Sequence, residues 1–372
     1  MAVSLVSTGV TFPDNSTQTT AATGFGFKNR LINSAMVIDQ RNAGAEVNPA
    51  VTGYYVDRWN YFQNQTSKGK IGQNAGAVTP PVGFTNYLGF TSTSAYALLT
   101  ADQFLIRQDI EGLNTADLAW GTASAATVTL SFWVRSSLTG SFGGAIQNNG
   151  RDRNYPFAFT INSANTWEYK TVTISGDTTG TWLTTNGRGI TVTFSLGTGA
   201  TYSATAGAWT GTSFITSATG ATSVVGTNGA TFYITGVQLE KGSTATSFDY
   251  RPYSTELQLA QRYYYKLIPA SGSNLSVSAY AEGATAGRAT GSFPVTLRTA
   301  PSALEQSGTA ADYIIRTGGT NRTCSAVPAY NTGTNTDLWM VATTVASGQT
   351  AGQAGALFSN ASGAYLAWSA EL

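Results

Sequence analysis

The sequence contains no histidine and only one cysteine, Cys324. Without histidine, the chain lacks the commonest general base and the commonest zinc ligand. A single cysteine excludes an intramolecular disulfide and any cysteine metal cluster. Charged residues make up only 10% of the chain, against roughly 25% in an ordinary soluble domain. We therefore expect a protein that holds no metal and no other cofactor.

Long apolar segments and clusters of like charge are also missing. No window approaches the ~20 apolar residues of a membrane helix, so we expect no membrane insertion. The formal net charge is +1 and no run of Lys or Arg occurs, so nucleic acid is not an expected partner. Met1–Val6 has no basic region before an apolar segment, which argues against a signal peptide. These features fit a protein that is made in a reducing cytoplasm, although it can act in another compartment.

What the chain has in abundance is typical of β-structure. Aromatic residues make up 12% of the chain, and 41 residues are glycine. Thr and aromatic residues favour strands, whereas Gly and Asn favour turns. A length of 372 residues is large for a single core. We therefore predict an all-β protein with two or more domains.

The pattern along the chain divides it into segments. Residues 1–30 are small and polar, with a predicted turn at Pro13–Ser16, and we expect other chains to order this segment. From Leu31 to Tyr253, strands alternate with turns, and no amphipathic helix interrupts them. Thr127–Arg135 alternates most clearly, with Val128, Leu130, Phe132 and Val134 on one face. This pattern predicts a jelly-roll β-sandwich over 31–253.

A helix and a second β domain are predicted after Tyr253. Ser254–Lys266 has Thr255 as N-cap and Gln258 three residues later, which resembles a capping box and predicts a helical linker over 254–267. A smaller distal β-sandwich is predicted over 268–372. Its expected strands are Leu275–Tyr280, Ala289–Leu297, Tyr313–Arg316, Leu338–Thr344 and Ala364–Leu372.

Several short motifs, taken in order, resemble one known family. They are Phe12–Thr20, Val56–Trp59, Ile110–Leu113, Leu130–Arg135, Trp167–Tyr169, Val237–Gly242, Phe248–Pro252, Phe293–Arg298 and Tyr365–Leu372. This ordered set resembles bacteriophage tail fibres that carry a carbohydrate-binding-module-like jelly roll. The resemblance implies a homotrimer in the virion, attached to another tail or baseplate protein by its N-terminal segment. It also implies a distal half that contacts the host surface.

Glycan binding is the function that fits this composition. Sugars are held by aromatic rings against their C–H faces and by hydrogen bonds from Asn, Asp, Gln and Arg. The candidate glycan-binding residues lie in polar loops that carry aromatics: Arg151, Asp152, Asn154, Tyr155, Tyr202, Trp209, Tyr330, Asn331 and Trp339. Trp133 and Trp167, by contrast, are expected in the core. We predict that the protein attaches to a surface glycan, which is either lipopolysaccharide or capsule, without catalysis.

Two other functions stay open. A glycosidase needs two carboxylates held ~5 to 9.5 Å apart, and the acidic residues of this chain show no spacing signature for such a pair. The acidic residues concerned are Asp102, Asp109, Glu111, Asp117, Asp152 and Glu168. A polysaccharide depolymerase is thus the third hypothesis, after a purely structural virion component such as a tail connector or capsid-bound fibre.

The stretch Val237–Tyr253 is predicted to close the first domain and lead to the second. Glu240 and Asp249 are interpreted as hydrogen-bonding or charge-pairing anchors at a strand end. Phe248 and Tyr250 are expected to hold the two domains, or the trimer, together.

Overall fold

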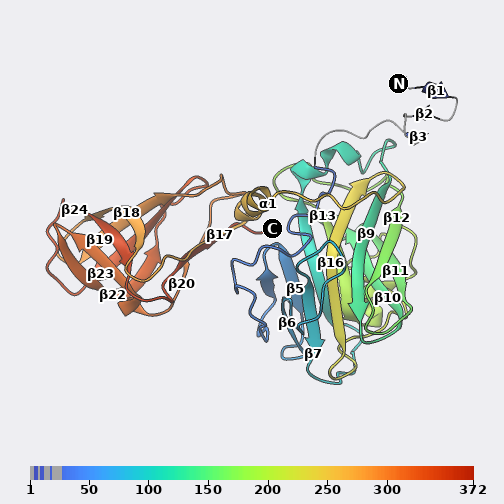
Figure 1. Ribbon diagram of the computed structural model, residues 1–372, viewed down its shortest axis with the longest axis horizontal. Coiled ribbons are helices and arrows are strands. Elements are labelled where there is room, and N and C mark those ends of the chain that lie inside the picture. The colour runs from blue at the N-terminus through green and yellow to red at the C-terminus, as the bar shows by residue number, and fades with distance from the viewer. Residues whose placement is uncertain (1–3, 7–8, 12–16, 19–26) are drawn as a thin grey trace.

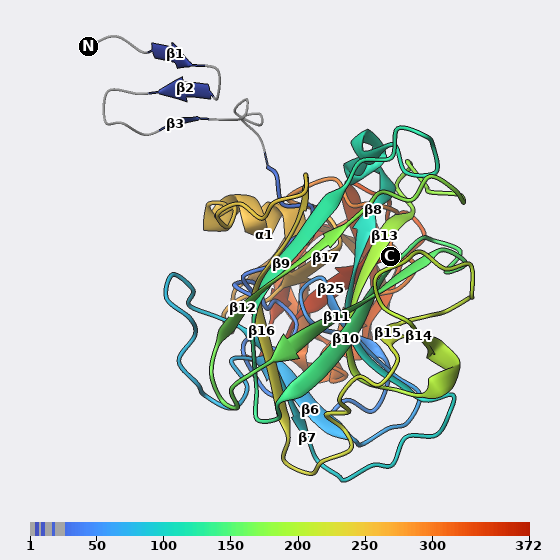
Figure 2. The same cartoon turned by 90° about the vertical axis from the view of Figure 1, so that its right-hand side faces the viewer.

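The computed structural model describes residues 4–6, 9–11, 17–18 and 27–372, and nearly all regular structure in these ranges is β. Two β units lie side by side, with helix α1 (Tyr253–Gln261) between them (Figure 1). In Figure 2, which looks along the long axis, the second unit lies behind the first. No helix in these ranges is long and apolar enough to cross a membrane.

The described part of the N-terminal segment is a small antiparallel sheet. Its strands are β1 (Ser4–Val6), β2 (Gly9–Thr11) and β3 (Thr17–Gln18). The turn predicted at Pro13–Ser16 lies outside the described residues, as does most of the segment expected to attach to other chains. Asn29 already belongs to the first unit, because its side-chain amide donates to the carbonyl of Val237 at 2.9 Å.

The first unit is a β-sandwich of two antiparallel sheets, as predicted. One sheet has the order β11-β10-β13-β8-β5-β4, with β4 at Gly53–Val56, β5 at Trp59–Gln63, β8 at Gln103–Glu111, β10 at Gly140–Gln147, β11 at Asn154–Ile161 and β13 at Arg188–Thr198. The other has the order β12-β9-β16-β7-β6, with β6 at Gly69–Gln73, β7 at Leu88–Ser92, β9 at Val128–Ser136, β12 at Glu168–Ile174 and β16 at Thr231–Lys241.

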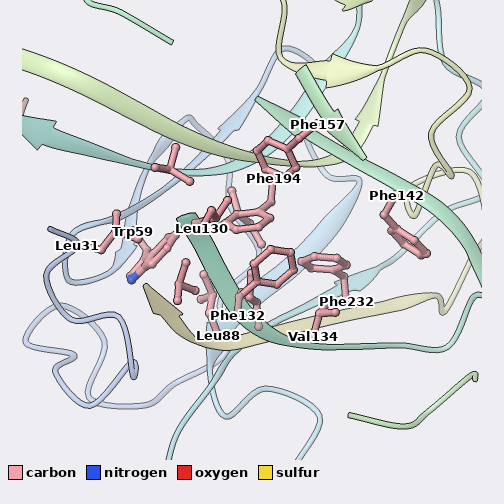
Figure 3. Close-up of a cluster of buried hydrophobic side chains, with 14 of the residues drawn as sticks. Leu31, Trp59, Leu88, Leu130, Phe132, Val134, Phe142, Phe157, Phe194 and Phe232 are labelled. Atoms are coloured by element: carbon pink, nitrogen blue, oxygen red, sulfur yellow. The ribbon is translucent and has the colours of Figure 1, made fainter. Parts of the chain in front are cut away.

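The core lies between these sheets, and β9 provides one row of it. Val128, Leu130, Phe132 and Val134 are all 0% exposed, which confirms the face predicted from their alternation. Figure 3 shows Phe132 facing Phe194 of the opposite sheet, with ring centroids 5.0 Å apart in an edge-to-face arrangement. The core is thus rich in aromatic side chains, and burying each of them contributes roughly 1.5–3 kcal/mol to stability.

Four short 3-10 helices and one small sheet complete the connections of the described chain. The 3-10 helices span Gly112–Asn114, Ala116–Leu118, Ala200–Tyr202 and Ala310–Asp312. In the long loop after β13, β14 (Ser203–Ala204) and β15 (Ser217–Ala218) pair in parallel. Val224 and Val225 of this loop are fully buried, so the loop packs on its own sandwich.

The helix is shorter than predicted, and its expected cap is wrong. α1 begins at Tyr253 with Pro252 as N-cap and no side-chain capping bond, so Thr255 lies inside the helix. The Glu256 carboxylate accepts a hydrogen bond from the backbone of Asn33, which ties the first turn to the sandwich. The helix ends at Gln261 because the chain then enters β17 (Tyr264–Leu267), which pairs with β25.

The second unit is a closed barrel rather than the predicted sandwich. Its strand order is β18-β19-β23-β22-β21-β24, with β18 at Asn274–Ala281, β19 at Ala286–Ser292, β21 at Tyr313–Thr317, β22 at Thr320–Tyr330, β23 at Leu338–Val345 and β24 at Ala354–Ser359. β18 pairs with both β19 and β24, which closes the sheet on itself. A small sheet of order β17-β25-β20 adjoins it, with β20 at Glu305–Gln306 and β25 at Leu366–Ser369.

Charged side chains join the two units. Glu371, after β25, pairs with Arg41 at 3.2 Å and with Arg58, which is almost fully buried. Arg262, after α1, makes two hydrogen bonds to Glu111 of the sandwich, at 2.7 and 3.0 Å. Arg58 thus has an internal ion pair, and its partner comes from the other unit.

Candidate functional site

A strap formed by residues 243–251 covers part of the outer face of the five-stranded sheet. The carboxylate of Glu240 accepts the backbone N–H of Thr246 at 2.8 Å and its hydroxyl at 2.7 Å. The side-chain oxygen of Gln238 accepts the backbone N–H of Asp249 at 2.8 Å. Glu240 and Gln238 are buried beneath the strap. The interpretation of Glu240 as an anchor is confirmed, and Asp249 acts likewise by accepting the backbone N–H of Asn29 at 3.1 Å.

A bulge at Gly236 lets an aromatic ring lie directly on the sheet. The register of β16 against β9 shifts between Thr235 and Gln238, and Gly236 has a φ of 60°. A Cβ at Gly236 would lie 2.5 Å from Cζ of Phe84, so only glycine leaves room for this ring.

Phe84 also forms one wall of aromatic rings with the strap. Its ring centroid lies 5.1 Å from that of Phe248 and 5.5 Å from that of Tyr250. The Tyr250 hydroxyl donates to the carbonyl of Gly83 at 2.9 Å. Phe248 and Tyr250 therefore pack on a loop of the sandwich, so the structure does not support their expected role in joining the two units.

Two more rings form the opposite wall. Trp133 on β9 and Tyr169 on β12 are direct cross-strand partners, with ring centroids 5.4 Å apart. Tyr169 is 44% exposed and Trp133 is half-buried on the outer face, so the expected core position of Trp133 is wrong. Trp167, just before β12, is also half-buried, and its indole N–H donates to the carbonyl of Thr79.

These walls enclose what we call the outer groove, with a volume of about 570 Å³. Its lining is Val82, Phe84, Ser131, Trp133, Tyr169, Gly236, Ala245, Thr246, Ser247, Phe248 and Tyr250. None of these residues, all in the described range 27–372, is charged. Tyr250 is 59% exposed, and burial of its hydroxyl region raises its pKa. The groove thus offers open aromatic faces beside hydroxyl groups.

The charged residues of β12, Glu168 and Lys170, form an ion pair that stabilises the strand and the loop before it. Burial opposes the charge on Glu168, but hydrogen bonds from Lys170 and from the backbone N–H groups of Ser163 and Asn162 outweigh it and lower the pKa of Glu168 to about 2. Glu168 stays ionised over the neutral range and fixes the loop before β12.

The first group of predicted site residues lies at the turn from β10 to β11. Asn154 is fully buried, and its amide donates to the carbonyls of Arg151 and Thr212, so its hydrogen bonds hold the loops together. Asp152 is exposed and accepts from Asn148 at 2.6 Å. Arg151 is half-buried, and this burial lowers its pKa to about 10.

Tyr155 and Trp209 meet in a second aromatic cluster. Their ring centroids are 5.3 Å apart, and Trp209 also packs edge-to-face on Trp120 and Trp182 at 5.4 and 5.5 Å. The rings bury each other's faces, and the Trp209 indole N–H donates to the carbonyl of Ser175. Tyr202 is half-buried in its 3-10 helix, and no ring contact joins it to this cluster in the described structure.

The remaining predicted residues lie in the barrel. The Tyr330 hydroxyl donates to the carbonyl of Pro301 at 2.7 Å, and the side-chain oxygen of Asn331 accepts the backbone N–H of Gly333 at 2.9 Å. Trp339 is only 3% exposed and lines a cavity of about 660 Å³ in the barrel wall. The nine predicted residues therefore do not come together in one site, and the outer groove contains none of them.

Comparisons with known proteins give only distant matches. No protein-family model matches the sequence, and no curated protein matches it. A putative sugar binding protein from Bacteroides thetaiotaomicron has a TM-score of 0.34 at 11% identity, over 57% of this chain and 100% of that one. A carbohydrate-binding module, TmCBM61, solved with beta-1,4-galactotriose, has a TM-score of 0.30 at 11% identity, over 57% and 99%.

A phage protein also matches. It is the enzymatically active domain of tailspike protein 4 of bacteriophage CBA120, with a TM-score of 0.30 at 9% identity. The match covers 58% of this chain and 22% of the tailspike chain. At these identities and TM-scores, such matches carry no information on what this chain binds.

Proposed function

We propose that this chain is a non-enzymatic adhesin of a bacteriophage tail fibre, and that its outer groove binds a neutral glycan of the host surface. The observation that carries the proposal is the pair of aromatic walls, in which Tyr169 and Tyr250 remain 44% and 59% exposed. Soluble proteins rarely leave rings grouped in this way without a ligand or partner.

The chemistry of the outer groove suits a sugar. Pyranose rings present apolar C–H faces that pack on aromatic rings, and Trp133, Tyr169 and Tyr250 offer such rings. Ser247, which is exposed, brings a hydroxyl group to the same space for hydrogen bonds with sugar hydroxyls. The absence of charge in the lining favours a neutral saccharide over a phosphorylated or acidic one.

The carboxylates support binding without catalysis, because most have structural partners. Asp102 accepts from Tyr96, Asp109 pairs with Arg188, Glu111 with Arg262, and Asp117 with Arg30. A general acid or nucleophile must instead face a substrate within hydrogen-bond reach.

The place of the protein in a virion rests on the ordered motifs described above. In the proposal the N-terminal segment attaches a homotrimer to another tail or baseplate protein, after synthesis in the host cytoplasm. Three outer grooves in one fibre would multiply weak sugar contacts by avidity, without any new contact.

The proposal is tested with the intact chain on an array of bacterial surface polysaccharides and lipopolysaccharides. Tyr169→Ala and Tyr250→Ala should each weaken binding of any retained glycan about tenfold, since each removes one stacking ring. Tyr253→Ala is the matched control, because Tyr253 is 62% exposed on α1 and lies outside the groove. Its binding should stay unchanged. Thermal stability should stay unchanged in Tyr169→Ala and Tyr253→Ala, whereas Tyr250→Ala should also melt lower, because it loses the hydrogen bond to Gly83 and the contacts with Phe84 and Phe248.

Three results would contradict the proposal. If no glycan were retained and the protein failed to block phage adsorption, the structural virion role would be favoured. If Tyr155→Ala or Trp209→Ala abolished binding while Tyr169→Ala did not, the site would lie in the second aromatic cluster. Release of reducing ends from a polysaccharide would favour the depolymerase.

A further inference from the structure

Basic side chains gather around one carboxylate on the outer face of the six-stranded sheet. Arg107 and Asp109 lie two residues apart on β8, so their side chains share a face. Ile106, next to Arg107, is buried in the core, so this shared face points away from the core. Across the ladder, the hydroxyl of Thr191 on β13 donates to the Asp109 carboxylate. Arg188, at the start of β13, places its Nε 3.2 Å from Oδ2 of Asp109.

Arg151 approaches the same place from the turn between β10 and β11. Gln147, the last residue of β10, pairs with Thr191, and the turn that carries Arg151 follows directly. The pKa of Arg151 is lowered to about 10, first by burial and then by the charges of Arg107 and Arg188. Burial, together with the charge of Arg188, also lowers the pKa of Arg107. The three guanidinium groups therefore lie close enough to repel one another.

We call Arg107, Arg151 and Arg188 the arginine cluster, and its charges do not balance. Within residues 27–372, Asp109 is the one carboxylate that pairs with any of them. Glu111 is the cross-strand neighbour of Arg188, but its carboxylate already pairs with the segment after α1. Three positive charges thus face one negative charge. Cations that are partly buried together are unfavourable unless a counter-charge compensates them.

Hydrogen-bond donors also exceed acceptors at this place. No hydrogen bond contributes to the pKa of Arg151, so its guanidinium donors are free within the described chain. Nε of Arg188 and the hydroxyl of Thr193, which is the cross-strand partner of Arg107, are buried without a hydrogen-bond partner there. Arg188 is 22% exposed, and Arg107 and Arg151 are half-buried, so a ligand can reach the guanidinium groups from solvent. The cluster thus lacks an acceptor-rich, negatively charged partner.

We propose that the arginine cluster binds an oxyanion group of a ligand, either a carboxylate or a phosphate. A guanidinium group presents planar pairs of N–H donors, which match the oxygens of both groups in bidentate contacts. The anion would offset the repulsion among the three guanidinium groups and accept the free hydrogen bonds of Arg151. The arginine cluster shares no residue with the outer groove, so this site is separate from the one proposed for a neutral glycan.

The test is calorimetric titration of the intact chain, at low ionic strength, with glucuronate and with inorganic phosphate, and with glucose as the neutral control. Arg151→Gln should lower the affinity for the anion about tenfold or more, because it removes a charge and a bidentate donor. Arg151→Lys keeps the charge but loses the planar donors, so it should lower affinity less. Arg316→Gln is the matched control, because it removes the same charge from an exposed position on β21 of the barrel.

The two anions distinguish the sources of the oxyanion. Binding of glucuronate but not phosphate would assign the site to an acidic sugar, and the reverse result would assign it to a phosphate group. Either result supports the proposal. Added salt should weaken the binding in both cases, because it screens the charges.

Arg151→Gln should keep or raise the melting temperature, because it relieves repulsion from Arg107 and Arg188. A lower melting temperature would show that Arg151 supports the fold instead. The proposal would be overturned if neither anion bound at millimolar concentration, if glucose bound as well as glucuronate, or if Arg151→Gln and Arg316→Gln had equal effects. Tyr169→Ala should leave anion binding unchanged, so a failure of the outer groove proposal is distinguished from a failure of this one.

Discussion

Gly236 determines the shape of the outer groove at the scale of one residue. Its φ of 60° is left-handed, and a Cβ there would lie 2.5 Å from Cζ of Phe84 and 3.2 Å from Cδ1 of Trp133. An L-residue pays about 1–2 kcal/mol for this backbone conformation alone. The contact with Phe84 adds to that cost, because the ring is held by Phe248 and Tyr250.

Gly236→Ala should therefore lower the free energy of unfolding by about 2–4 kcal/mol in urea titrations. Gly229→Ala is the matched control, because Gly229 has a φ of 75° but no atom within 4 Å of the added Cβ. That variant should lose only the conformational part, about 1–2 kcal/mol. Equal losses in the two variants would mean that Phe84 moves aside freely.

At the scale of an element, the strap is held by hydrogen bonds to buried side chains rather than by a β-ladder. Glu240 is 3% exposed and accepts from Gln238 and from Thr246. Removing its carboxylate leaves those donors without an acceptor beneath the strap, which costs about 1–3 kcal/mol.

Glu240→Ala should accordingly destabilise the chain by about 1–3 kcal/mol and release the strap locally. Hydrogen exchange at the Thr246 amide should accelerate, while the amides of β9 beneath it keep their protection. Glu282→Ala is the control, because the Glu282–Arg288 pair on the barrel is partly exposed and should contribute less than about 0.5 kcal/mol. An unchanged Thr246 exchange rate would contradict the anchoring role of Glu240.

At the scale of the whole molecule, Glu371 connects the two units. Its side chain is 6% exposed and pairs with Arg41 and with Arg58, whose side chain is 1% exposed. Truncating one member of a buried pair leaves the other charge without compensation, which typically costs about 3–5 kcal/mol. The Arg58 guanidinium also lies 3.6 Å from the ring centroid of Tyr263, so the loss extends to the segment after α1.

Glu371→Ala should therefore lower stability by about 3 kcal/mol or more and separate the unfolding of sandwich and barrel into two calorimetric transitions. Asp117→Ala is the control, because Asp117 is 56% exposed and pairs with Arg30 inside the first unit. That variant should lose about 1 kcal/mol or less and keep the wild-type profile. A single, barely shifted transition in Glu371→Ala would show that other contacts hold the sandwich and the barrel together.

The barrel shows which strands can be predicted from the local sequence pattern and which cannot. β23 was predicted at Leu338–Thr344 and is observed at Leu338–Val345, because alternation is a local signal. β22 (Thr320–Tyr330) was missed because it is polar and contains Pro328, and β24 (Ala354–Ser359) because it is built from small residues. Alternation is the same in a sandwich and a barrel, so closure could not be read from it.

The sequence by itself determined the all-β class and the row of core residues in β9, since the first follows from composition and the second from period-two alternation. The outward position of Trp133 also follows from the sequence, because Trp133 lies between Phe132 and Val134, which face the core. Only the tertiary structure decided the outer groove, because its rings come from two strands, a loop and the strap, and meet only after the strap folds across the sheet.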